Sequence, residues 1–334
     1  MKNRTVPVFV VHRGCPHRCV FCDQRSITGS DFDLNAVPDR LEEAFSRPAN
    51  RGAQIAFFGG SFTAIPQRDM LFMLDCAQSF VDRGLASGIR FSTRPDAVDG
   101  AVMDLLKPYT LTAVELGIQS MSDAVLQKCE RGHTAEDSRL AARAVIRSGR
   151  ELVGQMMLGL PGSSAEDEIN TARGIADMGA RAARVYPTAV FRGTVLEKMA
   201  LSGEYAPLEH ADALERAKAV CRVFTDAGVK LIRVGLCESD GLRTDAMSGE
   251  TSPSFGEEVY SALWLDRETA LLDPLRGSLS GAPLELRCPP GAESRAAGYR
   301  GANKKELIAR YGLKYLRITA DPSLTGDTVR ARIL

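Results

Sequence analysis

The chain has 334 residues, and its 42 basic and 42 acidic side chains give a formal net charge of zero. This length fits one large domain or one domain with an appendage. The balanced charge excludes a global electrostatic footprint for nucleic acid, while a local basic patch stays compatible with it. The apolar run at residues 6–11 is too short for a signal peptide or a membrane span. Eight cysteines without a secretory signal indicate a reducing cytoplasm, where metal ligands and buried thiols are commoner than disulfides.

In chain order, short apolar runs alternate with amphipathic stretches. The predicted strands are 6–12, 53–60, 88–95, 111–120, 152–162, 182–190 and 230–236. The predicted helices include 69–83, 136–148, 166–179 and 210–227. This alternation predicts an α/β fold in which a parallel sheet has helices outside it. Since six βα units are fewer than a closed barrel needs, we expect a partial (β/α)6 barrel over residues 1–245.

The pattern weakens after about residue 245. A turn-rich linker leads to a predicted helix at 256–271, a strand at 284–288, a basic helix at 304–312 and a strand at 314–318. Residues 246–334 are therefore predicted to form a small α/β appendage.

The informative residues come where predicted strands end. Cys15, Cys19 and Cys22 follow the first strand, residues 59–61 end the second, and Arg94 ends the third. Because ligands bind at the carboxyl ends of parallel strands, we expect the functional site along this edge.

The three cysteines are spaced Cys-x3-Cys-x2-Cys. Three thiolates on one loop can hold three irons of a four-iron cluster and leave the fourth iron open to a small molecule. A structural zinc site with His12 or His17 as fourth ligand is the alternative.

With Phe21 before the third cysteine, the run GCPHRCVFC resembles the radical S-adenosylmethionine (SAM) superfamily. The segments STRPD (92–96), VELGIQS (114–120), RGHT (131–134), MLGLPG (157–162) and YPTAVFRGTVL (186–196) narrow the resemblance. They are similar to the radical SAM core of the elongator catalytic subunit, which modifies wobble uridines in tRNA. Oxygen-independent coproporphyrinogen III oxidases share a looser version. The resemblance covers roughly residues 5–240.

The resemblance implies that Cys15, Cys19 and Cys22 are the metal ligands and catalytic residues, holding a [4Fe-4S] cluster whose open iron SAM chelates. It further implies a flavodoxin-like or ferredoxin-like electron donor. Reductive cleavage of SAM then yields a 5′-deoxyadenosyl radical that abstracts hydrogen from a substrate held above the strand ends.

Carried over by position, eight residues are candidate contacts to SAM. They are Phe21, Gly59, Gly60, Ser61, Ser92, Gln119, Arg131 and Leu160. Adjacent glycines permit close backbone approach to a ligand, and a guanidinium suits the methionine carboxylate. Ser61 and Ser92 stand where many members have acids, which leaves their own roles open. The glycine segments are also compatible with turns that bind no ligand.

Five further residues are candidate substrate contacts. Arg94 and Arg192 suit an anionic group, with a structural ion pair as the alternative. Glu115 shares a strand face with Gln119 by alternation, and a buried ion pair is its alternative. Tyr186 is either a cavity or a core aromatic, and Cys237 is either a hydrogen donor or passive.

The substrate is less constrained. Residues 250–334 are too short for the elongator acetyltransferase domain, so acetyl transfer is not carried over. The basic segment 304–310 is either a phosphate contact or a solvated helix face. An RNA base or nucleoside is the preferred substrate. A small metabolite or tetrapyrrole, a non-catalytic cluster or haem carrier, and a zinc-stabilised RNA-binding protein are the alternatives.

Overall fold

The structure is a computed structural model that describes residues 4–10, 15, 19–22, 32–237 and 244–334. The chain divides into two compact units, Met1–Thr251 and Ser252–Leu334. A domain boundary after residue 245 stays a prediction. Of the helices that the structure describes, none combines the length and apolar character that a bilayer crossing demands.

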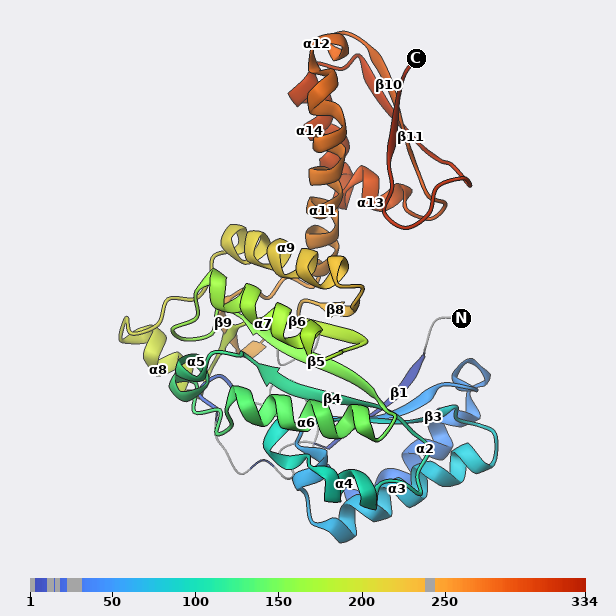
Figure 1. The fold of residues 1–334 in the computed structure, drawn as a ribbon, viewed down its shortest axis with the longest axis vertical. Coiled ribbons are helices and arrows are strands. Elements are labelled where there is room, and N and C mark those ends of the chain that lie inside the picture. The colour runs from blue at the N-terminus through green and yellow to red at the C-terminus, as the bar shows by residue number, and fades with distance from the viewer. Residues whose placement is uncertain (1–3, 11–14, 16–18, 23–31, 238–243) are drawn as a thin grey trace. The chain divides into compact units, whose positions relative to one another are not determined.

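The first unit is built on one seven-stranded sheet in which every neighbouring pair is parallel (Figure 1). Its strands follow chain order: β1 (Thr5–Phe9), β2 (Gln54–Phe58), β3 (Gly88–Thr93), β4 (Leu111–Gln119), β5 (Glu151–Leu158), β6 (Ala182–Pro187) and β8 (Lys230–Val234). All seven lie within the predicted ranges or within one residue of them. The sheet curls into a half-barrel, which confirms the predicted partial barrel.

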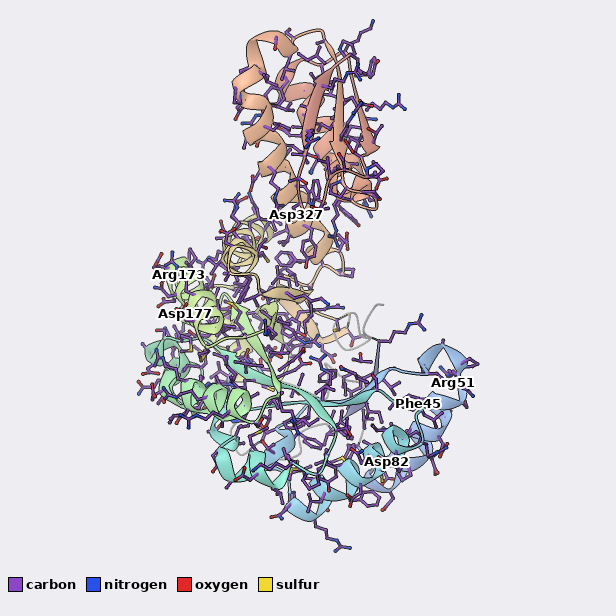
Figure 2. All side chains as sticks on the ribbon, turned by 45° about the vertical axis from the view of Figure 1, so that its right-hand side comes forward. Phe45, Arg51, Asp82, Arg173, Asp177 and Asp327 are labelled. Atoms are coloured by element: carbon purple, nitrogen blue, oxygen red, sulfur yellow. The ribbon has the colours of Figure 1, made fainter. Side chains whose placement is uncertain are left out.

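Helices cover the outer face of this sheet. They are α2 (Val37–Ser46), α3 (Gln67–Asp82), α4 (Gly100–Leu105), α6 (Ala135–Arg147), α7 (Ala165–Asp177) and α9 (His210–Asp226). Two further helices, α5 (Asp123–Lys128) and α8 (Val195–Leu201), pack instead in one apolar cluster with Val20. The fully buried Ile55, Phe57 and Phe91 belong to the core of this unit. In Figure 2 Arg173 and Asp177 of α7 lie on the side of the helix away from the sheet, as expected of its polar face.

Local sequence explains where two of these helices begin. Thr134 and Asp137 form a capping box at the start of α6, and Ser164 and Asp167 form another at the start of α7. Each box satisfies backbone N–H groups that have no partner inside the helix. The short helices α2, α4, α5 and α8 were not predicted from the sequence.

The predicted strand 182–190 divides in the structure. β6 stays in the main sheet, whereas β7 (Ala189–Phe191) pairs antiparallel with β9 (Ala246–Gly249). The break lies at Thr188, whose N–H and hydroxyl both donate to the carbonyl oxygen of Leu158, at 2.9 and 2.6 Å. These two hydrogen bonds end the regular pairing of the strand and turn the chain away from the main sheet.

The second unit is a three-stranded sheet with helices on one face. α11 (Phe255–Leu272), α12 (Arg276–Leu279), α13 (Glu293–Ala297) and α14 (Ala302–Tyr311) accompany β10 (Pro283–Cys288), β11 (Tyr315–Ala320) and β12 (Arg330–Ile333). β10 is central, parallel to β11 and antiparallel to β12. The edge strand β12 was not predicted: its four residues alternate arginine with an apolar side chain, but so short a run after a turn-rich stretch gives only a weak strand signal.

Candidate functional site

The loop after β1 is anchored around Cys19. Cys19 is buried, and its carbonyl oxygen accepts from the N–H of Cys22 at 3.0 Å. Val20 donates to the carbonyl of Cys129 at 3.2 Å and accepts from Leu196 at 2.8 Å. These bonds fix the cysteine loop against α5 and α8. None of the eight cysteines is in a disulfide.

Two buried guanidinium groups approach the Cys19 sulfur. Arg131 Nη1 lies 3.4 Å from it and Arg94 Nη1 lies 3.9 Å from it. Arg94 is 2% exposed and Arg131 8%. Arg94 also donates to the backbone carbonyl of Arg131. The site therefore holds two positive charges beside the sulfur that would carry negative charge as a metal ligand.

Asp96 orients Arg94 from the turn after β3. Arg94 Nε and Nη2 donate to the two carboxylate oxygens of Asp96, at 2.9 and 3.2 Å. Burial lowers the pKa of Arg94, but Asp96, Cys19 and Cys15 outweigh it and the pKa is raised. The ion-pair alternative for Arg94 is thus what the structure contains.

The end of β4 brings Gln119 next to Arg131. Gln119 has a φ of +67°, where the pairing of β4 with β5 shifts register. A Cβ on Gly117 would lie 2.8 Å from Arg131 Nη2 and 3.0 Å from Gln119 Nε2, so both side chains need this glycine. Arg131 Nη2 donates to the Gly117 carbonyl at 2.7 Å. Gln119 Oε1 is buried without a hydrogen-bond partner among the described residues. A strained backbone and an unmet acceptor are typical of a ligand site.

The segment after β2 lies at the same edge of the sheet. Gly59 has a φ of +92°, and Ser61 is buried. The hydroxyl groups of Thr63 and Thr93 are 2.7 Å apart and tie this segment to the end of β3. Ser92 is half-buried and pairs in register with Glu115.

The LGLPG segment after β5 is held by a buried carboxylate. Glu168 of α7 accepts from the Gly159 N–H at 2.6 Å and from Arg216 at 3.1 Å. Burial raises the pKa of Glu168, and these two partners oppose that effect. Leu160 lies in an apolar cluster with Val20, against which Phe21 packs. This cluster joins the cysteine loop to the β5 end.

Inside the half-barrel, Glu115 makes two ion pairs. Its carboxylate oxygens lie 2.6 Å from Arg90 Nη2 and 2.6 Å from Arg184 Nε. Arg184 Nη1 is 3.4 Å from the Tyr186 hydroxyl. Burial raises the pKa of Tyr186, although Arg184 opposes it. The ion-pair alternative for Glu115 is therefore present, and the group carries one net positive charge.

Two family models match the chain. The radical SAM superfamily model covers residues 9–174, and the radical SAM C-terminal domain model covers residues 180–264. The chain belongs to the radical SAM superfamily. It is a radical SAM enzyme, and members of this superfamily use SAM and a [4Fe-4S] cluster.

Two curated relatives are similar to this radical SAM enzyme over more than half of its length. An uncharacterized protein of Methanocaldococcus jannaschii is 28% identical over 59% of this chain and 64% of its own length. A tRNA uridine(34) acetyltransferase of Methanocaldococcus infernus is 30% identical over 74% of this chain and 53% of its own length. The chain therefore spans about half the length of that acetyltransferase.

Solved structures confirm the fold. Elp3 of M. infernus superposes with a TM-score of 0.62 at 23% identity, covering 78% of this chain and 62% of that one. Coproporphyrinogen III oxidase of Escherichia coli superposes with a TM-score of 0.50 at 15% identity, covering 68% of this chain and 53% of that one. Both families named by the sequence resemblance are thus found among the neighbours.

The remaining predicted site residues lie apart from this cluster or outside the residues that the structure describes. Arg192 is exposed after β7, and its N–H donates to the Asp245 carbonyl at 2.9 Å. Cys237 is exposed after β8. His12 and His17 fall outside the described residues. Within the described parts of the chain, no three His, Cys, Asp or Glu side chains converge as one metal ion would require.

Sequence reasoning missed four partners of the site residues: Asp96, Arg90, Arg184 and Glu168. Strand alternation carried a signal for two of them, because Arg90 shares a strand face with Ser92 and Arg184 shares one with Tyr186. Asp96 lies beyond the end of β3, where the sequence has no period to follow. Glu168 lies in the first turn of α7, where an acidic residue is expected to be exposed rather than buried.

Proposed function

We propose that Cys15, Cys19 and Cys22 hold a [4Fe-4S] cluster with SAM beside it, and that the enzyme abstracts hydrogen from an RNA base or nucleoside. What carries the proposal is the constellation of Cys19, Arg94, Arg131 and Gln119 at the strand ends. When bound, the cluster and SAM supply a 5′-deoxyadenosyl radical after reduction by a flavodoxin-like or ferredoxin-like donor.

The residues present fit these two groups. Three thiolates are the ligands that iron–sulfur clusters prefer, and each binds a different iron, so they need not converge on one point. The unmet Gln119 Oε1 is a buried acceptor that would cost about 1–3 kcal/mol without a donor from a ligand. The Nε of Arg131, also buried and without a partner among the described residues, offers a donor to a carboxylate.

The protein groups have separable roles in this proposal. Arg94 and Arg131 offset negative charge at the cysteine loop, and Asp96 fixes Arg94. Leu160 and the residues packed around Phe21 exclude water from this end of the sheet. Ser61, Ser92 and the adjacent glycines contribute mainly backbone atoms to SAM.

The RNA substrate is supported by relatives. Two relatives named tRNA uridine(34) acetyltransferase, both from Methanocaldococcus, are 26% and 30% identical to this chain. The net positive charge around Glu115, Arg90 and Arg184 suits a substrate with an anionic group. That charge also suits a carboxylated metabolite, which is the second candidate.

The first experiment measures 5′-deoxyadenosine from anaerobically reconstituted, dithionite-reduced protein with SAM, with iron, sulfide and zinc counted on the same sample. We expect cluster-dependent product, and we expect Cys19→Ala to lower it by at least about 100-fold, because one of three cluster ligands is lost. Cys76→Ala, which removes a half-buried thiol from α3, is the matched control. Zinc without iron, or substantial cleavage by Cys19→Ala, would overturn the cluster assignment.

The second experiment tests the substrate class. Unmodified tRNA transcript is added, and we expect 5′-deoxyadenosine to form faster and to carry deuterium from base-deuterated RNA. A full cluster with product that no RNA accelerates would direct the search to small metabolites. A full cluster that never yields product would support a carrier.

A further inference from the structure

The three-stranded sheet of residues 252–334 has two unlike faces. Leu284, Leu286 and Leu316 alternate onto one face, where each is at most 2% exposed. That face packs in one apolar cluster with Leu272 of α11 and Leu307 of α14. In Figure 1 the helices of this unit lie on that side of the strands.

The opposite face carries arginines from all three strands. Arg317 of β11 and Arg332 of β12 both pair in register with Glu285 of β10, and Arg330 pairs with Arg287. Arg317, Arg330 and Arg332 are exposed, and Arg287 is half-buried. Because successive strand residues point to opposite sides, these four arginines share one face, here called the arginine face.

Two carboxylates accompany the arginine face without neutralising it. Glu285 accepts from Arg287 Nε at 2.8 Å, which with Arg317 holds the pKa of Glu285 below its usual range. Asp321 follows β11, and its pKa is lowered first by Ser323 and then by Arg287 and Arg330. Four arginines against two carboxylates leave two net positive charges. Within residues 252–334, all of which the structure describes, no helix of this unit covers this face.

Tyr315 adds an aromatic surface to the arginine face. It lies two residues before Arg317 on β11, so both point the same way, and it is 46% exposed. Guanidinium forks match phosphate oxygens, and exposed aromatic rings stack on unpaired bases. Neighbouring strands lie about 5 Å apart and alternate residues about 7 Å apart, so several groups can meet one flexible strand together.

We propose that the arginine face binds the phosphate backbone of the RNA on which this enzyme acts. The inference rests on the proposed RNA substrate and locates a contact to it outside the half-barrel. The basic segment 304–310 belongs to α14, which packs on the apolar face instead. The sequence could not single out the arginine face, because its members are spread over 46 residues and meet only through strand register.

The test compares two triple variants of the full-length reconstituted enzyme. Arg317→Gln/Arg330→Gln/Arg332→Gln removes three exposed charges from the arginine face. Lys304→Gln/Lys305→Gln/Arg310→Gln removes three exposed charges from α14 and is the matched control. Anaerobic fluorescence anisotropy with a fluorescein-labelled, unmodified tRNA transcript gives Kd at several salt concentrations. Formation of 5′-deoxyadenosine without RNA is the check on folding.

We expect the arginine-face variant to bind tRNA at least about tenfold more weakly at 100 mM salt. Its slope of log Kd against log salt should fall by about 2, since each single-strand phosphate contact contributes about 0.7. The α14 variant should stay within about twofold of the wild type. Both variants should form 5′-deoxyadenosine without RNA at the wild-type rate.

Each contrary result has a distinct meaning. Equal weakening by both variants, or no weakening by either, would overturn the arginine face while leaving RNA as substrate. Equally tight binding of labelled polyglutamate, lost in the same variant, would identify an acidic-protein surface instead. If tRNA binds through the arginine face but never accelerates 5′-deoxyadenosine formation, the surface stands and the proposed substrate fails. Absence of tRNA binding by the wild type would overturn both.

Discussion

Arg94 and Arg131 are buried side chains that meet at one sulfur atom. Burying a guanidinium is costly unless it is paired, and Arg94 is paired with Asp96 and with a backbone carbonyl. Hydrogen bonds and positive charge near cluster sulfurs favour the reduced, more negative state. In the proposed enzyme Arg94 and Arg131 therefore raise the reduction potential of the cluster, and they also hold the cysteine loop in place.

The change Arg94→Gln tests this role. We expect the cluster to load, because all three cysteines remain, and its midpoint potential to fall by on the order of 60 mV, which corresponds to about 1.4 kcal/mol for one electron. Titration followed by electron paramagnetic resonance measures the shift. Arg83→Gln, which breaks an exposed pair with Glu42, is the control and should leave the potential unchanged. An unchanged potential in Arg94→Gln would contradict the assignment.

At the scale of elements, α11 carries a buried acid one turn from the only tryptophan. Glu268 is fully buried, and neither carboxylate oxygen meets a donor with good geometry in the described chain, although Asn303 lies near. Burial raises the pKa of Glu268 to about 8. Trp264 is 2% exposed on the same helix, so its fluorescence reports on this unit.

The raised pKa of Glu268 predicts a pH-dependent stability of the second unit. The folded unit keeps a proton that the unfolded chain releases above pH 4.5. The stability that this proton confers is complete below that pH and is lost as pH rises towards about 8. Between these two pKa values the free energy of unfolding should fall by about 1.4 kcal/mol per pH unit. Urea unfolding followed by Trp264 fluorescence should therefore show a total loss of roughly 3–5 kcal/mol over this pH range.

Glu268→Gln should remove most of this pH dependence and raise the free energy of unfolding at pH 8, because a neutral amide of similar shape replaces the charge. Glu257→Gln, at an exposed position of α11, is the control and should keep the wild-type profile. A wild-type protein whose Trp264 transition does not move between pH 5 and 8 would argue against a buried, protonated Glu268.

At the scale of the whole molecule, the chain has two cores. Ile55, Phe57 and Phe91 belong to the seven-stranded sheet, whereas Leu284 and Leu286 belong to the second unit. The three-stranded sheet and the half-barrel share no strand. We therefore expect a substitution that destabilises one core to leave the stability and activity of the other unit unchanged.

Paired core substitutions test this independence. Leu286→Ala should destabilise the Trp264 transition by about 2–5 kcal/mol and leave RNA-independent 5′-deoxyadenosine formation near the wild-type rate. Phe57→Ala should lower that rate by disturbing the half-barrel and leave the Trp264 transition in place. Loss of both readouts in either variant would mean that the two units unfold as one.

Much of the fold followed from local pattern, since strand and helix periods are written in neighbouring residues. The seven parallel strands and the open barrel were predicted and are confirmed, and so is membership of the radical SAM superfamily. Short helices such as α5 were not predicted. The antiparallel pair of β7 with β9 was not predicted either, because hydrogen bonds from Thr188 to Leu158 separate β7 from β6 and its partner strand is distant in the sequence.

The sequence by itself determined the alternation of strands and helices, the three cysteines on one loop and the family to which they belong. These features depend on the spacing of residues along the chain, which is visible in the sequence without a structure. Only the tertiary structure decided that Arg131 reaches Cys19 across 112 residues, that Glu115 is held by two arginines, and that four arginines form one face. Such contacts depend on how strands register and helices pack, because strand alternation assigns a charged side chain to a face of the sheet but does not select its partner.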